Sequence, residues 1–313
     1  MAALFHEGER RLQRSLGVEA RIARMGQRMI GDHLDPGFQD FYSRISLLIG
    51  GVVDENGDAW ATPLVGAPGF LSSPDAFTLQ VAARLSASDP AMAGLRDGAP
   101  VGLQGISLEH RARTRLNGIV EMTGEDGFSV RVVQSYGNCP KYIQRRMPRM
   151  MTGGGGAAVE ETTALTAAAR SMIGAADTFF VASYAERADG AGRQVDVSHR
   201  GGKTGFVRFD ADGGLTIPDY AGNMMFNTLG NFLVTPQAGL LFIDFENGDL
   251  LQLTGDAVVI LDHPDIARFE GAERLWRFMP RRVVRRPDAL PLRWDFLDWS
   301  PFSLKTGRWA DVA

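Results

Sequence analysis

The sequence predicts a mainly β protein with flanking helices (α+β), built as two tandem β-barrels that pair within one chain. Three observations predict this class. Short apolar segments bounded by turn signals recur along the chain, as they do in barrels and sandwiches. Neither half alternates strands with long helices, which argues against a doubly wound sheet. A long internal repeat indicates that one domain occurs twice.

Glycines at matching intervals carry this repeat. Residues 66–70 and 202–206 share the pattern G-x-x-G-F, and an apolar run containing a glycine follows each, 36 and 37 residues after the first glycine. Another glycine follows 16 residues later in both copies, at Gly118 and Gly255. The unit is longer than the roughly 20–50 residues of a solenoid repeat. We therefore expect a duplicated domain with a cleft between its copies.

The chain then divides into five segments. Residues 1–35 are expected to be helical, because apolar residues recur at near-helical spacing among arginines and glutamates. Residues 36–146 form the first barrel and 162–280 the second. Four consecutive glycines (153–156) mark residues 147–161 as a linker. Residues 281–313 form a tail with several tryptophans, in which the strand pattern weakens.

Turn and capping signals place the elements within each barrel. The sequences Glu55-Asn56-Gly57-Asp58 and Asn247-Gly248 are hairpin turns, and Asp89 before Pro90 begins a short helix. Further helices are expected at 36–45, 162–173 and 227–234. The expected strands are 47–54, 60–65, 77–82, 101–106, 119–122, 128–133, 179–184, 194–200, 205–209, 215–218, 239–245, 250–253 and 257–261.

Composition excludes several classes of function. The net charge of −4 provides no basic field for nucleic acid. No apolar stretch approaches the roughly 18 residues of a membrane span, and the N-terminus lacks a signal-peptide pattern, so we expect a cytoplasmic protein. The single cysteine excludes an internal disulfide. The five histidines lie far apart, and we expect no metal site.

The second copy is rich in small polar donors, which suit an anionic ligand. Ser198 and Arg200 share one strand face, and a helix beginning at Asn227 would present free N–H groups to a phosphate. The first copy has Thr62-Pro63-Leu64 where the second has Ser198-His199-Arg200. The alternative is a polar hairpin with capping asparagines. The full set is Ser198, Arg200, Lys203, Asn223, Asn227, Thr228 and Asn231.

The first copy carries a second polar cluster. Alternate arginines would lie on one strand face, where they are either solvated or line an anion-binding cleft. The cysteine beside them is either a reactive thiol or a small packed residue. The cleft candidates are Arg111, Arg113, Arg115, Asn138, Cys139 and Lys141.

Together these segments resemble the pyridoxamine 5'-phosphate oxidase-like, FMN-binding split-barrel superfamily, in particular its two-barrel subgroup, which is related to proteins fused to a ferredoxin-reductase-like module. The resemblance covers about residues 36–280. Its matching strings are YGNCPKYIQ (136–144), VDVSHRGG (195–202), GNMMFNTLGN (222–231) and GLLFIDF (239–245). The chain lacks the Arg-x-Val-Leu-Leu and Ser-Arg-Lys phosphate signatures of the vitamin-salvage enzyme, so pyridoxamine phosphate is not the expected substrate.

The resemblance implies that FMN lies between the two barrels, held by the polar set of the second copy and by Gln252 on a later strand. It implies an FMN-dependent oxidoreductase of unknown substrate, reduced by NAD(P)H or by a separate reductase. The alternative is a non-catalytic carrier of flavin or haem on the same fold. One chain would form both halves of the usual dimer, as a monomeric pseudo-dimer or within a homodimer, and would bind one flavin.

Overall fold

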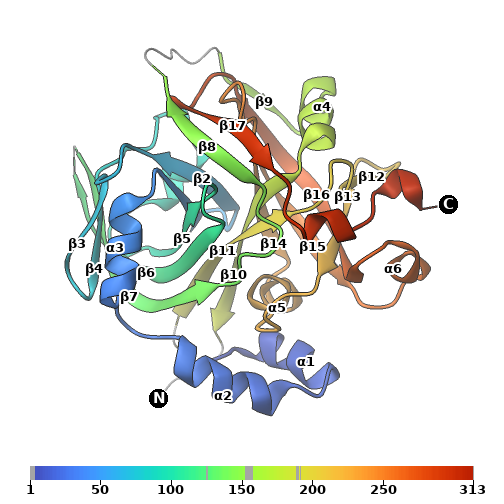
Figure 1. Cartoon of the computed structure of the whole chain (residues 1–313), viewed down its shortest axis with the longest axis horizontal. Coiled ribbons are helices and arrows are strands. Elements are labelled where there is room, and N and C mark those ends of the chain that lie inside the picture. The colour runs from blue at the N-terminus through green and yellow to red at the C-terminus, as the bar shows by residue number, and fades with distance from the viewer. Residues whose placement is uncertain (1–3, 125, 152–157, 188–189, 191, 313) are drawn as a thin grey trace.

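The protein is described by a computed structural model that covers residues 4–124, 126–151, 158–187, 190 and 192–312. Two antiparallel sheets form its body, and helices lie against them (Figure 1). The prediction of a mainly β fold with flanking helices is confirmed. In the described residues each sheet is open, because the strand order does not return to its first strand.

The first sheet has the order β2-β1-β5-β6-β7-β4-β3. Helix α3, capped by Asp35, packs beside it, and a short 3-10 helix, η1, begins after Asp89, as the sequence predicts. The elements are α3 (Pro36–Arg44), β1 (Leu47–Val53), β2 (Ala59–Val65), β3 (Leu71–Asp75), β4 (Thr78–Val81), η1 (Pro90–Gly94), β5 (Pro100–Ser107), β6 (Ala112–Gly124) and β7 (Gly127–Asn138).

The second sheet has the order β11-β10-β14-β15-β16-β13-β12, and β9 pairs with β16 beside it. The elements are β9 (Glu160–Thr162), α4 (Ala167–Ala175), β10 (Thr178–Arg187), β11 (Gly192–Gly201), β12 (Arg208–Phe209), β13 (Leu215–Tyr220), α5 (Asn227–Val234), β14 (Gln237–Ile243), β15 (Leu250–Ile260), α6 (Pro264–Arg268) and β16 (Ala272–Arg286).

The remaining elements lie at the two ends of the chain. Helices α1 (Glu7–Ser15) and α2 (Glu19–Met29) confirm the predicted helical N-terminus, and α1 packs on α5 (Figure 1). Strand β8 (Arg145–Met150) pairs with β17 (Leu292–Asp298) in a separate ribbon. Two short 3-10 helices, η2 (Ser303–Lys305) and η3 (Trp309–Asp311), end the described chain.

The two sheets have the same strand order and share one bulge at an equivalent position. When β1 to β7 are matched to β10 to β16 in chain order, each hairpin and crossover of one sheet has its counterpart in the other. The pairing of β6 with β7 shifts at Gly118, and that of β15 with β16 shifts at Gly255. A Cβ at either glycine would lie within 2.3 Å of a carbonyl oxygen on the neighbouring strand, so both bulges require glycine.

The sheets also contact each other reciprocally. A Cβ on Gly102 would lie 2.9 Å from the Val195 oxygen, and one on Gly239 would lie 2.4 Å from the Ala59 oxygen. Ala59 and Val195 both precede the first glycine of G-x-x-G-F by seven residues. Each copy therefore places its glycine against the equivalent strand of the other, the pattern of a two-fold interface. A buried apolar cluster shared by β1, β2 and β5 with β10, β11 and β14 fills this contact.

Four boundary predictions need correction. No strand was predicted between residue 261 and the boundary at 280, whereas the 15-residue strand β16 begins at Ala272 and crosses that boundary. Strands expected at 250–253 and 257–261 form one bulged strand, β15. The predicted helix 162–173 begins only at Ala167, after the Thr166 cap. Strand β8 occupies the start of the predicted linker, whose glycines lie outside the described residues.

Candidate functional site

A polar pocket opens between the two copies and encloses about 950 Å³, open solvent included. Strands β5, β6 and β7 and the loop before β8 provide one wall. Strands β11, β13 and β16 and the start of α5 provide the other.

The pocket carries an excess of positive charge, although the chain has a net charge of −4. Among the described residues that line it, Asp219 is the one carboxylate. Such an excess in a concave, partly dry site favours an anionic ligand. The lining cations are Arg113, Arg115, Lys141, Arg200 and Arg274.

Arg113 is held by backbone carbonyl groups rather than by a carboxylate. Its Nε donates to the Cys139 carbonyl oxygen at 2.8 Å and its Nη1 to the His199 carbonyl oxygen at 3.4 Å. Within the described part of the chain it forms no ion pair. Burial, reinforced by the charge of Arg115, lowers the pKa of Arg113 to about 9. A bound anion would supply the missing countercharge.

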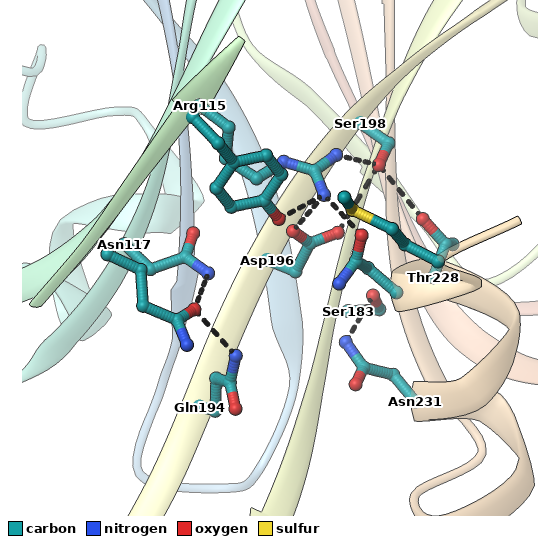
Figure 2. A network of polar contacts seen from close by, with 12 residues as sticks. Arg115, Asn117, Ser183, Gln194, Asp196, Ser198, Thr228 and Asn231 are labelled. Carbon is teal, nitrogen blue, oxygen red and sulfur yellow. Dashed lines mark hydrogen bonds and ion pairs between the residues drawn. The ribbon is translucent and has the colours of Figure 1, made fainter. Parts of the chain in front are cut away.

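Arg115 is the centre of a buried network (Figure 2). It forms a 2.8 Å ion pair with Asp196 and donates to Asn227 Oδ1 at 3.0 Å and to Ser198 Oγ. Thr228 Oγ1 also donates to Ser198 Oγ, at 2.9 Å. Burial raises the pKa of Asp196, and the neighbouring Arg115 opposes this effect. The network fixes the side chains of Arg115 and Ser198 at the N-terminus of α5.

The backbone at the pocket is strained at three positions. Tyr142, Met224 and Phe226 have φ values of 66°, 62° and 64°, and all three line the pocket. Residues other than glycine rarely occupy this left-handed region, and such strain concentrates at functional sites. Phe226 is also the N-cap of α5 and provides no side-chain cap. The first N–H groups of α5 therefore have no capping oxygen from that residue.

Asp219 and the aromatic residues form the other end of the pocket. Asp219 is held by Arg200 at 2.5 Å and by Arg274 at 3.0 Å. The rings of Tyr142 and Tyr220 lie 5.2 Å apart, centre to centre. Arg274 also pairs with Glu273, so the charges at this end are balanced. The flat rings of Tyr142 and Tyr220 beside them suit a planar ligand.

Most of the residues chosen from the sequence meet in this pocket. The second copy contributes Ser198, Arg200, Asn223, Asn227 and Thr228, and the first contributes Arg113, Arg115, Asn138, Cys139 and Lys141.

Four of the chosen residues lie elsewhere. Asn231 is buried under α1 and contacts Ser183 and His6. Gln252 is buried against Asp89 at the contact between the copies and does not line the pocket. Arg111 pairs with Asp298, and Lys203 lies on the turn before β12.

Sequence reasoning missed several lining residues, including Gln104, Tyr142, Asp219, Tyr220, Phe226 and Arg274. Tyr142 and Phe226 lie within strings that carry the family resemblance and could have been found there. Arg274 could not, because the strand that presents it, β16, was not predicted.

His199 differs from its neighbours on β11. Its ring packs edge-to-face on Phe180, 5.6 Å away, and both ring nitrogens are buried without a partner in the described residues. Burial lowers the pKa of His199 well below its usual value, so the ring is neutral.

Glu9 is a buried acid next to the pocket. Helix α1 approaches α5 closely enough that a Cβ on Gly8 would lie 2.1 Å from the Gly230 oxygen. Glu9 then accepts from the His6 backbone at 2.8 Å and from Asn227 Nδ2 at 2.6 Å. Burial raises the pKa of Glu9 from 4.5 to about 8. Asn227 links this acid to Arg115.

The raised pKa of Glu9 predicts a pH dependence of stability. Between about pH 5 and 8 the folded state holds a proton that the unfolded state has lost, so the free energy of unfolding should fall as pH rises. Glu9→Gln should reduce this slope in urea titrations at pH 5, 6.5 and 8. Glu7→Gln, which changes an exposed residue of the same turn, is the control. Equal slopes for Glu9→Gln and the unaltered protein would contradict the prediction.

In the part of the chain that the structure describes, no cluster of three or more His, Cys, Asp or Glu side chains is placed to hold a metal ion. No described helix combines the length and the apolar character needed to cross a membrane.

These features define a class: a mainly β protein with a cation-lined pocket between two similar sheets. No family model and no curated protein matches the chain. It resembles solved structures at low identity. A HupZ variant from Group A Streptococcus has 12% identity and a TM-score of 0.31, over 39% of this chain and 98% of that one.

A pyridoxamine 5'-phosphate oxidase-like protein from Lactobacillus delbrueckii has 14% identity and a TM-score of 0.27, over 34% of this chain and 95% of that one. The motility inhibitor MotI of Bacillus subtilis has 10% identity and a TM-score of 0.21, over 77% and 87%.

Proposed function

We propose that the protein is an FMN-dependent oxidoreductase of unknown substrate, built from two tandem split barrels at residues 36–146 and 162–280. The observation that carries the proposal is the pocket between the copies, lined by five cations and one carboxylate. It supports binding of a ligand that combines an anionic group with a planar ring. The cytoplasmic location and the choice of NAD(P)H or a separate reductase as electron donor are parts of the same proposal.

The matched sheets support the duplication. Equal strand order, bulges at Gly118 and Gly255, and reciprocal packing of Gly102 and Gly239 are expected of two copies related by a two-fold axis. A single chain would then contain the arrangement that two subunits usually form.

The residues of the pocket fit FMN at both ends. Arg115, Ser198 and Thr228 stand with the start of α5, where N–H groups and the helix dipole favour a phosphate. Tyr142 and Tyr220 offer flat surfaces to a ring. When bound, FMN supplies the redox chemistry. The chain's own part is to orient the ring and to place positive charge, from Arg113 or Arg200, where negative charge develops on reduction.

Arg200→Ala tests the proposal. Loss of a charge-assisted hydrogen bond should weaken FMN binding about 10- to 100-fold, measured by quenching of flavin fluorescence. Asp219 keeps Arg274 as its partner, so the fold should survive. Lys203→Ala, which removes a cation outside the pocket, is the control and should bind FMN normally. Equal affinity in both variants would contradict the assignment.

The visible spectrum of the purified protein separates the proposed enzyme from a carrier. A flavin spectrum that bleaches with NAD(P)H or with a reductase supports an oxidoreductase. A bound flavin that is never reduced by either supports a carrier. A Soret band that appears on adding haem, in a protein that binds no flavin, would indicate that haem rather than FMN is the cofactor.

A further inference from the structure

A second polar cluster is buried at the contact between the copies, away from the open pocket. Asp89 is 4% exposed and accepts from Thr62 Oγ1 at 2.6 Å, from Gln252 Nε2 at 3.0 Å and from Arg286 Nη1 at 2.6 Å. The groups around this carboxylate are therefore a hydroxyl, an amide and a guanidinium. Two come from the second copy and one from the first.

The internal repeat relates this cluster to the open pocket. Thr62 precedes Gly66 by four residues, as Ser198 precedes Gly202. Gln252 precedes the bulge at Gly255 by three residues, as Arg115 precedes the bulge at Gly118. In the open pocket, Ser198 and Arg115 therefore occupy the positions of Thr62 and Gln252.

The strand register extends the match to the third group. Three residues before each bulge, Gln252 pairs with Val284 and Arg115 pairs with Tyr136. Five residues before each bulge, Leu250 pairs with Arg286 and Arg113 pairs with Asn138. Asn138 is therefore the counterpart of Arg286. Its Nδ2 is buried and has no hydrogen-bond partner in the described residues, although it lines the pocket.

The residue that corresponds to Asp89 is Phe226. Asp89 lies 13 residues before Gly102, and Phe226 lies 13 residues before Gly239. Both are N-cap residues: Asp89 caps η1 through the Ala91 N–H, whereas Phe226 caps α5 without a side-chain bond. One copy thus holds its own carboxylate at this position and the other does not.

We propose that the Asp89 carboxylate is the internal counterpart of the anion that the open pocket binds. The pocket seats the anionic group of its ligand against Asn138 Nδ2, the Arg113–Arg115 pair and the Ser198 hydroxyl, whose proton turns from Asp196, 3.2 Å away, to the anion. The related cleft is closed to ligand because Asp89 already fills it. The identity of that ligand as FMN rests on the proposed function, but the position of the seat does not.

The charges around the seat agree with an incoming anion. Asp196 pairs with Arg115 and offsets its charge. Arg113 replaces the apolar Leu250 of the closed cleft and has no such offset among the described residues. The seat therefore keeps about one uncompensated positive charge, enough for a phosphate monoester with help from the start of α5.

Phe226→Asp tests the seat by restoring the missing carboxylate to the second copy. Aspartate adopts left-handed backbone more readily than phenylalanine, so the variant should fold with the backbone that Phe226 has. Its carboxylate should enter the seat and weaken FMN binding at least about 10-fold, a loss typical of one charged hydrogen bond. Phe226→Asn is the matched control without charge and should bind FMN within about threefold of the unaltered protein. Thermal melting of each variant checks folding.

The experiment is completed by measuring the binding of riboflavin and of inorganic phosphate, and the number of FMN molecules bound per chain. FMN should bind more tightly than riboflavin to the unaltered protein and about equally to Phe226→Asp, with one FMN per chain by equilibrium dialysis. The proposal is overturned if Phe226→Asp and Phe226→Asn bind FMN alike, or if two FMN bind per chain. If neither flavin binds, but phosphate stabilises the unaltered protein and not Phe226→Asp, the FMN function fails and the seat stands. If neither flavin nor phosphate binds, both fail.

Discussion

Replacing Arg115 by methionine is expected to lower the free energy of unfolding by about 3–5 kcal/mol, the usual cost of leaving one member of a buried ion pair without its partner. Both Arg115 and Asp196 are at least 95% buried. Without the guanidinium, Asp196 would lose its direct countercharge and keep hydroxyl contacts from Ser198, at 3.2 Å, and from Thr228. Tyr136 and Asn227 would lose their contacts to Arg115 as well.

Urea unfolding measures this loss. Arg131→Met is the matched control, because Arg131 pairs with Glu121 on the surface and should contribute less than about 1 kcal/mol. Adding Asp196→Asn to Arg115→Met should recover part of the stability, since it removes the unpaired charge. A similar, small loss in Arg115→Met and Arg131→Met would show that the Arg115 network does not stabilise the fold.

Asp89→Ala is expected to destabilise the protein by a similar amount, about 3–5 kcal/mol, because Arg286 would remain buried without a countercharge. The substitution also removes the acceptor for Thr62 and Gln252 and the cap of η1. Because these groups come from both copies, the loss should weaken the contact between them.

A double replacement separates the charge effect from general damage. Asp89→Ala combined with Arg286→Met removes both charges and should be more stable than Asp89→Ala alone. Asp311→Ala, which breaks an exposed pair with Arg308, is the control and should change stability by less than about 1 kcal/mol. If the double variant is no more stable than Asp89→Ala, the unpaired Arg286 is not the cause of the loss.

The glycine pattern predicted the repeat because each glycine meets a local steric requirement. A Cβ on Gly66 or Gly202 would collide with the phenylalanine ring that ends its own G-x-x-G-F motif, at 2.5 and 2.8 Å. Gly118 and Gly255 are required by bulges. Such short-range requirements remain visible in the sequence after the other residues of two copies have diverged.

Strand β16 was missed because its residues do not follow a simple pattern. It carries six arginines and a proline at its bulge, and its arginines pair with acids from distant segments, such as Asp219, Asp256 and Asp89. Alternation of apolar and polar residues predicts a strand only when one face is solvated. Partners far away in the chain are not visible to a local pattern.

Gln252 shows the limit of the site prediction. Resemblance placed it on a strand that contacts the cofactor, whereas the fold buries it against Asp89. The counterpart that does reach the pocket is Arg115, from the other copy. A repeated sequence gives two equivalent positions, and it does not say which of them faces the open cleft.

The sequence by itself determined the β class, the repeat, the polar strand at Ser198 and Arg200, and the helix that begins at Asn227. The polar strand and the helix depend on residues close together in the chain, and the repeat depends on glycines that each meet a local requirement. Only the tertiary structure decided that Arg113, Arg115 and Asn138 face that strand, and that Asp89 and Arg286, 197 residues apart, pair with each other. The physical reason is that a buried charge is stable only beside its countercharge, and the packing of the two copies, rather than the local sequence, brings those partners together.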